Sequence, residues 1–264
     1  NSVFTGKLLE WYKDRIQGIY VTPTPHDGGL TLGAAQYVYH QLLDNPRVKW
    51  EDHCPVYLGE HYSLEDVNSA IDKTSDKITS KKASVDDVVD LLDNQKIVSV
   101  FSGGSESGRR ALGNRSILAD PRSPEMKDMI NEKVKHRQWF RPFAPSILAE
   151  DTKDWFETDI ESPYMSFVVK FKEDVKDKVP AVVHFDGSAR LQTVTEKNNS
   201  FYYGLLKKWK KKSGVPILLN TSFNDREPIC ETPDHAIDCF LRTNIDHLYF
   251  GDFDILVSKI DKDD

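Results

Sequence analysis

The chain reads SGGSESGRRALGNRSILADPR from Ser102 to Arg122, and an apolar run over residues 97–101 precedes it. The apolar run is typical of a buried strand. Glycines in the following stretch allow the backbone to turn tightly and to approach a ligand closely; they are Gly103, Gly104, Gly108 and Gly113. Arginines among them suit bidentate binding of phosphate or carboxylate; they are Arg109, Arg110, Arg115 and Arg122. The stretch therefore predicts a strand, a glycine-rich loop that carries cations, and a second strand over residues 116–119.

Two interpretations of this loop remain open at the level of the sequence. Either the loop binds an anion, or it is a surface loop whose arginines are solvated. It is not a P-loop, because no Gly-Lys-Ser/Thr follows the glycines, and its glycine spacing is not Gly-x-Gly-x-x-Gly.

Composition limits the class of protein. With 264 residues, 39% of them hydrophobic, the chain is long enough for one large domain or two smaller ones. Its net charge of -7 disfavours nucleic acid as a partner, although basic residues can still gather in one place. No apolar run approaches membrane-spanning length and no signal peptide opens the chain, so we expect a cytoplasmic protein with no membrane partner. Cys54, Cys230 and Cys239 show no C-x-x-C spacing, so neither a disulfide framework nor a zinc site is predicted.

Apolar periodicity predicts helices and strands that alternate along the chain, as in an α/β protein. The expected helices cover residues 7–12, 30–43, 84–93, 124–134, 151–157, 200–212 and 232–241. The expected strands cover residues 16–21, 97–101, 116–119, 146–148, 165–171, 215–219, 248–250 and 255–257.

A second cationic segment, KHRQWFRPFAP, runs from Lys135 to Pro145. Its cations alternate with Trp139, Phe140 and Phe143, a pattern that can bind nucleic acid or a single nucleotide triphosphate. The alternative is a proline-rich loop whose aromatic side chains fill the core. We expect the aromatic side chains to pack, and Lys135 and Arg141 to face a ligand.

Two further motifs carry groups that suit anions. Arg190 lies beside a glycine turn in the stretch 186–194, and an apolar strand ends in the hydroxyl and amide side chains of Thr221, Ser222 and Asn224. Such groups bind phosphate oxygens without adding charge; they also form ordinary Asx or Ser/Thr turns. Both roles remain open from the residues alone.

Residues 25–29, PHDGG, predict a turn before the expected helix 30–43. A helix N-terminus that follows glycines can accept an anion. Asp27 either caps this helix or ligates a metal, and capping is the commoner role for an aspartate at such a position.

Four stretches in this order resemble O-carbamoyltransferases, a group that includes nodulation-factor, cephamycin and tobramycin carbamoyltransferases. The stretches are residues 110–122, 135–145, 186–194 and 218–224. The resemblance covers almost the whole chain, and four long motifs in the right order are far more specific than any one of them.

The resemblance implies a YrdC-like α/β domain with a twisted mixed sheet over residues 84–264. Residues 1–62 resemble the end of an actin-like (ASKHA-type) α/β domain, and residues 63–83 are expected to connect the two. In the family, the aspartate that matches Asp27 is one of three ligands of Fe²⁺ or another divalent metal. The other two ligands are histidines on a much earlier helix, which this chain lacks. We therefore expect Asp27 to ligate metal in an intact protein whose N-terminal half is missing here.

The resemblance also implies a reaction. ATP, with Mg²⁺, and carbamoyl phosphate give carbamoyl adenylate, and the carbamoyl group then passes to a hydroxyl of a small-molecule acceptor. The matching positions imply that Arg110, Lys135 and Arg141 are catalytic. They also imply the ATP-binding residues Arg115, Arg137, Arg190, Thr221, Ser222 and Asn224. We expect these groups to act by positioning and electrostatic stabilisation.

The chain departs from the family pattern in its first loop. Many members have Gln-Gly-Arg where this chain has 102–104, and many have proline where it has Arg109. We expect that the chain alone does not carbamoylate a final acceptor. Two alternatives are a threonylcarbamoyl-adenylate synthase and a non-catalytic nucleotide- or RNA-binding module.

Overall fold

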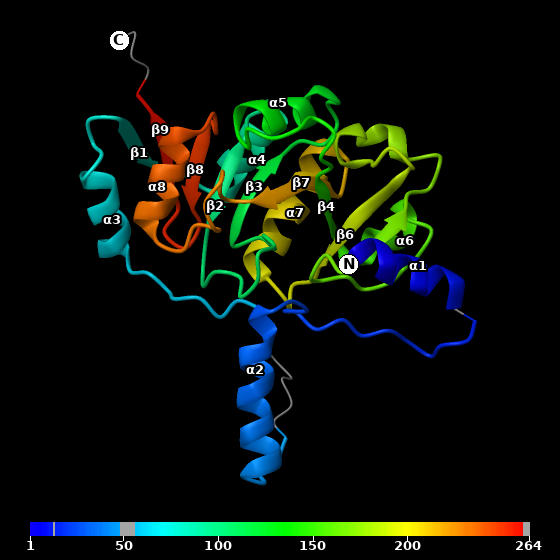
Figure 1. Cartoon of the computed structure of the whole chain (residues 1–264). Coiled ribbons are helices and arrows are strands. Elements are labelled where there is room, and N and C mark those ends of the chain that lie inside the picture. The colour runs from blue at the N-terminus through cyan, green and yellow to red at the C-terminus, as the bar shows by residue number, and fades with distance from the viewer. Residues whose placement is uncertain (13, 48–55, 261–264) are drawn as a thin grey trace.

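A computed structural model describes residues 1–12, 14–47 and 56–260 and shows one mixed sheet (Figure 1). The strand order is β1-β9-β8-β2-β3-β7-β4-β6-β5. The strands are β1 (Ile78–Lys82), β2 (Val98–Phe101), β3 (Arg115–Ala119), β4 (Ala144–Leu148), β5 (Phe167–Lys170), β6 (Ser188–Val194), β7 (Ile217–Ser222), β8 (His247–Phe250) and β9 (Ile255–Lys259). Strands β2 and β8 are parallel, as are β4 and β6, and the other neighbours are antiparallel. The α/β fold with a mixed sheet is therefore confirmed.

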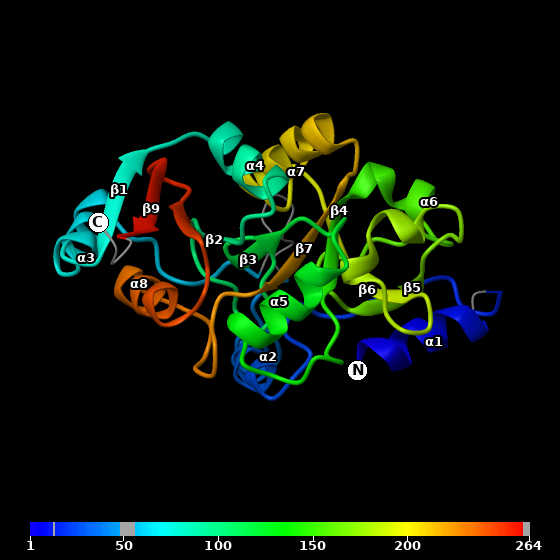
Figure 2. The same ribbon diagram turned by 90° about the horizontal axis from the view of Figure 1, so that it is seen from above.

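Helices cover both faces of this sheet (Figure 2). On one face, α4 (Val85–Asp93) and α7 (Ser200–Ser213) contact each other and bury Tyr202 and Trp209 completely. The larger core on the other face receives α3 (Leu64–Asp72), α5 (Glu125–Lys133), α6 (Thr152–Trp155) and α8 (Pro233–Arg242). Short 3-10 turns occur at Ala149–Asp151, Lys176–Lys178 and Pro180–Val182. In the described ranges, none of the helices combines the length and the apolar character needed to cross a membrane.

The N-terminus of α4 illustrates why several element boundaries could be predicted. Ser84 is its N-cap, and Ser84 Oγ accepts the backbone N–H of Asp87 at 3.4 Å. In return, Asp87 Oδ2 accepts the backbone N–H of Ser84 at 2.7 Å. This reciprocal capping box satisfies two N–H groups that have no partner inside the helix.

Two expectations about the first third of the chain are wrong. Residues 16–21 do not form a strand, because no neighbouring strand among the described residues pairs with them. Residues 63–83 are more than a connector, since α3 packs on α8 and β1 pairs with β9 in the sheet. The stretch looked polar because β1 is an edge strand in which only Ile78 is buried.

The first 47 residues place two helices outside the sheet. Helix α1 (Ser2–Tyr12) packs on β5, where a Cβ on Gly6 would come within 2.0 Å of the carbonyl oxygen of Val168. Helix α2 (Gly28–Tyr37) continues into a π-helical turn, Val38–Leu42, and projects away from the sheet (Figure 1). No residue of α2 is buried. The expected helix 30–43 is thus present, and the actin-like nature of residues 1–62 stays a prediction.

Candidate functional site

The pairing of the strands places the cationic motifs at one end of the sheet, where β2 and β7 end and β3, β4 and β6 begin. Strand β2 ends at Phe101 and β3 returns antiparallel from Arg115, so the glycine-rich loop lies at this end. Strand β7 is antiparallel to β3 and finishes here at Ser222. Strands β4 and β6 run opposite to β7 and begin here, which places Arg190 near the start of β6. Motifs far apart in the sequence therefore share one end of the sheet.

Four arginines at this end are close enough to repel one another. Burial, and then repulsion by Arg110 and Arg137, lowers the pKa of Arg190 to about 10. Burial, and then repulsion by Arg141, lowers the pKa of Arg137 to about 10. No carboxylate of the described chain forms a salt bridge with any of the four. A bound anion would relieve this repulsion between guanidinium groups.

Two of these arginines come from the loop and strand motifs. The Arg190 guanidinium donates from Nε to Ser2 Oγ of α1 at 3.1 Å. Arg110 is exposed, and its side chain donates no hydrogen bond within the described residues. The terminal nitrogens of both guanidinium groups therefore remain available for a ligand.

The loop with the other two arginines is held by Asn131, a residue that the sequence analysis did not single out. Asn131 is buried in α5. Its Oδ1 accepts from Arg137 Nε at 2.7 Å, and its Nδ2 donates to the backbone carbonyl of Arg141 at 3.0 Å. The Arg137 guanidinium also lies 4.7 Å from the ring centroid of Phe143. The available signal was a lone amide next to Ile130 on the buried side of the helix.

The expectation that the aromatic residues of this segment pack is only partly right. Phe143 is buried, whereas Trp139 and Phe140 are exposed. These two lie in a turn before β4 and meet each other edge to face, with ring centroids 6.1 Å apart. Their position in the turn, rather than their apolar character, decides their exposure.

Lys135 joins the end of α5 to the end of β7. Its Nζ donates to the backbone carbonyl of Ser222 at 2.5 Å and to Asn224 Oδ1 at 2.7 Å. Burial, and then repulsion by Arg137, lowers the pKa of Lys135 to about 7. The structure thus brings together Lys135, Ser222 and Asn224 from separate motifs, and the half-buried Thr221 precedes Ser222 in β7.

Arg115 has a different environment from the one expected of an ATP ligand. Its side chain is fully buried and lies 3.4 Å from the ring centroid of Phe101. Nη1 donates to the backbone carbonyls of Ser102 and Asn114, at 2.8 and 3.1 Å, and Nη2 donates to that of Gly103 at 3.1 Å. In this arrangement Arg115 holds the two sides of the glycine-rich loop together rather than facing a ligand.

Glu106 is buried inside this glycine-rich loop, and the sequence analysis did not single it out. Its Oε1 accepts the backbone N–H groups of Leu112 at 2.7 Å and of Asn114 at 2.9 Å. Burial raises the pKa of Glu106. A lone glutamate between serines gives no sequence signal for this role, because the contact depends on how the loop folds back.

Asp27 lies at the N-terminus of α2 without a side-chain cap hydrogen bond, so the capping role is not seen. His26 Nδ1 accepts the backbone N–H of Gly28 at 3.1 Å. Among the described residues, the potential metal ligands that lie close together are Glu227, Cys230 and Cys239, and Asp27 is not one of them. A metal at Asp27 would need further ligands, so the assignment stays a prediction.

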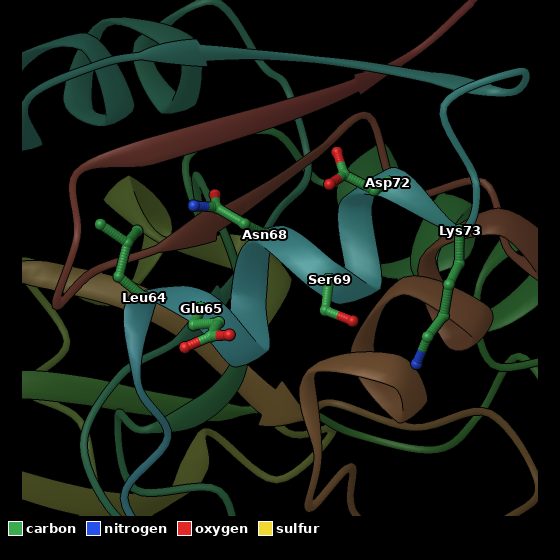
Figure 3. Close-up of a pocket in the computed structure, with 6 residues that line it drawn as sticks. All are labelled: Leu64, Glu65, Asn68, Ser69, Asp72 and Lys73. Carbon is green, nitrogen blue, oxygen red and sulfur yellow. The ribbon is translucent and has the colours of Figure 1, made fainter.

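A surface hollow lies on α3, away from these cations (Figure 3). Its lining comes from this helix and the residue after it, and every lining residue is exposed; they are Leu64, Glu65, Asn68, Ser69, Asp72 and Lys73. Lys73 is already engaged with Asp234 of α8 at 2.9 Å. No groups converge from different elements, so we assign this hollow no chemistry.

Residues 89–259 match the family described as "Carbamoyltransferase C-terminus". The chain belongs to this family. It is 42% identical over 267 residues to nodulation protein NolO of Bradyrhizobium diazoefficiens, which covers 96% of this chain and 47% of that protein. It is also 40% identical over 238 residues to an uncharacterized protein of Methanocaldococcus jannaschii, covering 88% of this chain and 39% of that protein. The chain thus spans about half the length, or less, of these relatives.

Two solved structures align with part of this chain. Full-length HypF in a phosphate- and nucleotide-bound form aligns with a TM-score of 0.44 at 18% identity, over 64% of this chain and 25% of that chain. A doubly substituted variant of Sua5 from P. abyssi aligns with a TM-score of 0.40 at 11% identity, over 58% of this chain and 42% of that chain.

Proposed function

We propose that the chain is part of an ATP-dependent O-carbamoyltransferase, and that the cationic end of its sheet binds ATP and carbamoyl phosphate. The observation that carries the proposal is the set of four arginines that repel one another without forming a salt bridge to a carboxylate of the described chain. Two polyanionic substrates that must approach each other need such compensation. Membership of the carbamoyltransferase family supports carbamoyl transfer as the overall chemistry.

The proposed reaction has two steps. Carbamoyl phosphate and water first give carbamate and inorganic phosphate. A carbamate oxygen then bonds to the α-phosphorus of ATP while the bond from this phosphorus to the bridging oxygen breaks, which gives carbamoyl adenylate and pyrophosphate. Negative charge grows on the leaving pyrophosphate, and fixed cations stabilise such charge better than water does. Mg²⁺ would bind mainly through the phosphates of ATP.

The proposed roles follow from the position of each group. Arg110 and Arg141 are exposed and would contact the reacting phosphates, whereas the partly buried Arg137 and Arg190 would bind the ATP phosphates. The Lys135 ammonium group is already bonded within the protein, so we propose that it positions the end of β7 against the nucleotide.

We further propose that this chain works with additional polypeptide. Apolar side chains of the α2 region are exposed; they are Leu30, Leu32, Tyr37, Val38, Tyr39, Leu42 and Leu43. The relatives are about twice as long as this chain. We propose that the remainder of such a protein covers α2, adds histidine ligands beside Asp27, and transfers the carbamoyl group to the acceptor hydroxyl.

The test is pyrophosphate release from ATP by the purified chain. Release that depends on carbamoyl phosphate supports the proposal, and release that depends on bicarbonate and threonine would show threonylcarbamoyl-adenylate synthesis instead. RNA retention without pyrophosphate from either mixture would show a binding module. Arg190→Ala should abolish the carbamoyl-phosphate-dependent signal. Arg15→Ala, at an exposed arginine without a side-chain hydrogen bond in the described chain, should retain it.

A further inference from the structure

The loop between β7 and α8 brings two cysteines and a carboxylate together. Cys230 lies in this loop and Cys239 in α8, and both thiols are free and buried. One carboxylate oxygen of Glu227 and the two sulfur atoms all lie within 4.8 Å of one another. The spacing Cys-x₈-Cys gave no recognisable zinc pattern, because the helix turns its second cysteine back toward the loop.

We propose that Glu227, Cys230 and Cys239 form a binding site for one thiophilic divalent cation such as Zn²⁺. Two thiolates and a carboxylate are common zinc ligands, and three protein ligands leave a fourth position for water. Sulfur atoms bound to one tetrahedral zinc lie about 4 Å apart, given zinc–sulfur bonds of about 2.3 Å. The present separation therefore requires only a small local adjustment.

Charge balance supports a divalent ion at this place. Arg242 donates from Nη2 to Glu227 Oε1 at 2.9 Å. With both thiols deprotonated, Glu227 and the two thiolates would carry three negative charges, and Arg242, which also pairs with Asp238 at 2.9 Å, offsets only part of them. A divalent cation would offset the charges of the two buried thiolates, and buried charges are tolerated when they are paired or bound to a metal.

The chemistry of the ligands gives binding a measurable consequence. Zinc binds thiolate rather than thiol, so an ion bound by Cys230 and Cys239 should release protons as it binds.

The bound ion would stabilise the turn in which Asn224 accepts a hydrogen bond from Lys135. Asn224 Nδ2 donates to the backbone carbonyl of Glu227 at 2.6 Å, and Lys135 Nζ donates to Asn224 Oδ1 at 2.7 Å. A ligand on the Glu227 side chain therefore lies one turn away from the cationic end of the sheet. The metal would act as a structural brace, and the proposal does not depend on the nature of the reaction.

The experiment is titration of the purified chain with Co²⁺, and then with Zn²⁺, in the presence of a non-thiol reductant that keeps both cysteines reduced. One equivalent of Co²⁺ should give thiolate-to-cobalt charge-transfer absorption, Zn²⁺ should displace it, and proton release should accompany binding. Cys230→Ala and Cys239→Ala should each lose the charge-transfer band. Cys54→Ala is the matched control and should retain it.

The cysteine variants could lose the signal because they do not fold. Glu227→Gln is therefore a second test of the site, since it keeps both thiols. It should keep the charge-transfer band and weaken the affinity for Zn²⁺ by about tenfold or more. A folded wild-type chain that binds no Co²⁺ through thiolate would overturn the proposal. Charge-transfer absorption that persists in Cys230→Ala and Cys239→Ala but disappears in Cys54→Ala would also overturn it.

Discussion

Lys135 Nζ and Asn224 Oδ1 lie 2.7 Å apart, although 89 positions separate the two residues. This contact ties the segment after α5 to the end of β7 and joins two of the motifs. Because Lys135 is buried, its protonation state is coupled to folding.

The pH dependence of stability tests the state of Lys135. Its pKa falls from 10.5 to about 7 in the folded chain, mainly through burial. Between these two values the unfolded chain binds more protons, so Lys135 makes stability rise with pH across this window. The stability difference between wild type and Lys135→Met should shift in favour of wild type by on the order of 2 kcal/mol between about pH 7 and 9.

Urea unfolding over this pH range measures the difference. Lys211→Met removes an exposed lysine of α7 and is the matched control, for which the difference should stay flat. If the stability difference between wild type and Lys135→Met did not change with pH, burial would not lower the pKa of Lys135.

Arg110→Ala should affect binding and stability in opposite directions. Removing one charge from the repelling set should leave the melting temperature of the ligand-free chain unchanged or higher. Loss of a charge-assisted contact should weaken ATP binding by about 1.5–3 kcal/mol. Calorimetry of ATP binding and thermal unfolding measure both quantities; unchanged affinity together with a lower melting temperature would indicate a purely structural arginine.

Glu106 should matter for folding more than for ligand binding. Glu106→Ala leaves the buried N–H groups of Leu112 and Asn114 without an acceptor, at a cost of about 1–3 kcal/mol for each group. Glu106→Gln keeps a carbonyl oxygen in the same place and should lose less. Equal losses in urea unfolding would contradict the assignment of Glu106 Oε1 as the acceptor that holds this loop.

Replacing each of two glycines by alanine should change the stability of the fold in opposite directions. Gly113 has φ +120°, and a Cβ there would lie 2.5 Å from Tyr202 Cδ1, so Gly113→Ala should destabilise the fold by more than about 1 kcal/mol. Gly204, in α7, has nothing within 4 Å of the added Cβ. Gly204→Ala should stabilise the chain by about 0.5–1 kcal/mol, since helix interiors favour alanine. Thermal unfolding of the two variants compares them directly, and the same sign for both would contradict the packing of the loop on α7.

Local rules predicted many elements of the sheet domain, because apolar periodicity and capping act over a few residues. The capping box at Ser84 and the strand before Ser102 are examples. Long-range pairing was beyond those rules: β1 is a polar edge strand that exists because β9 offers it a partner.

In the candidate site, too, the sequence predicted the role of some residues and not of others. Lys135, Ser222 and Asn224 could be selected as chemistry-bearing types in motifs, and the structure brings them together. Arg115 looked equally suited to a ligand, yet it is used inside the loop, where carbonyls and the Phe101 ring surround it. Sequence shows which groups can bind an anion, but the backbone path decides which of them remain free.

The most direct test of the central claim is a crystal structure of the chain with a non-hydrolysable ATP analogue. We predict that the triphosphate lies at the end of the sheet, with oxygens within hydrogen-bonding distance of the Arg110 and Arg190 guanidinium groups. A triphosphate bound elsewhere, with both of these arginines still facing solvent, would contradict the account.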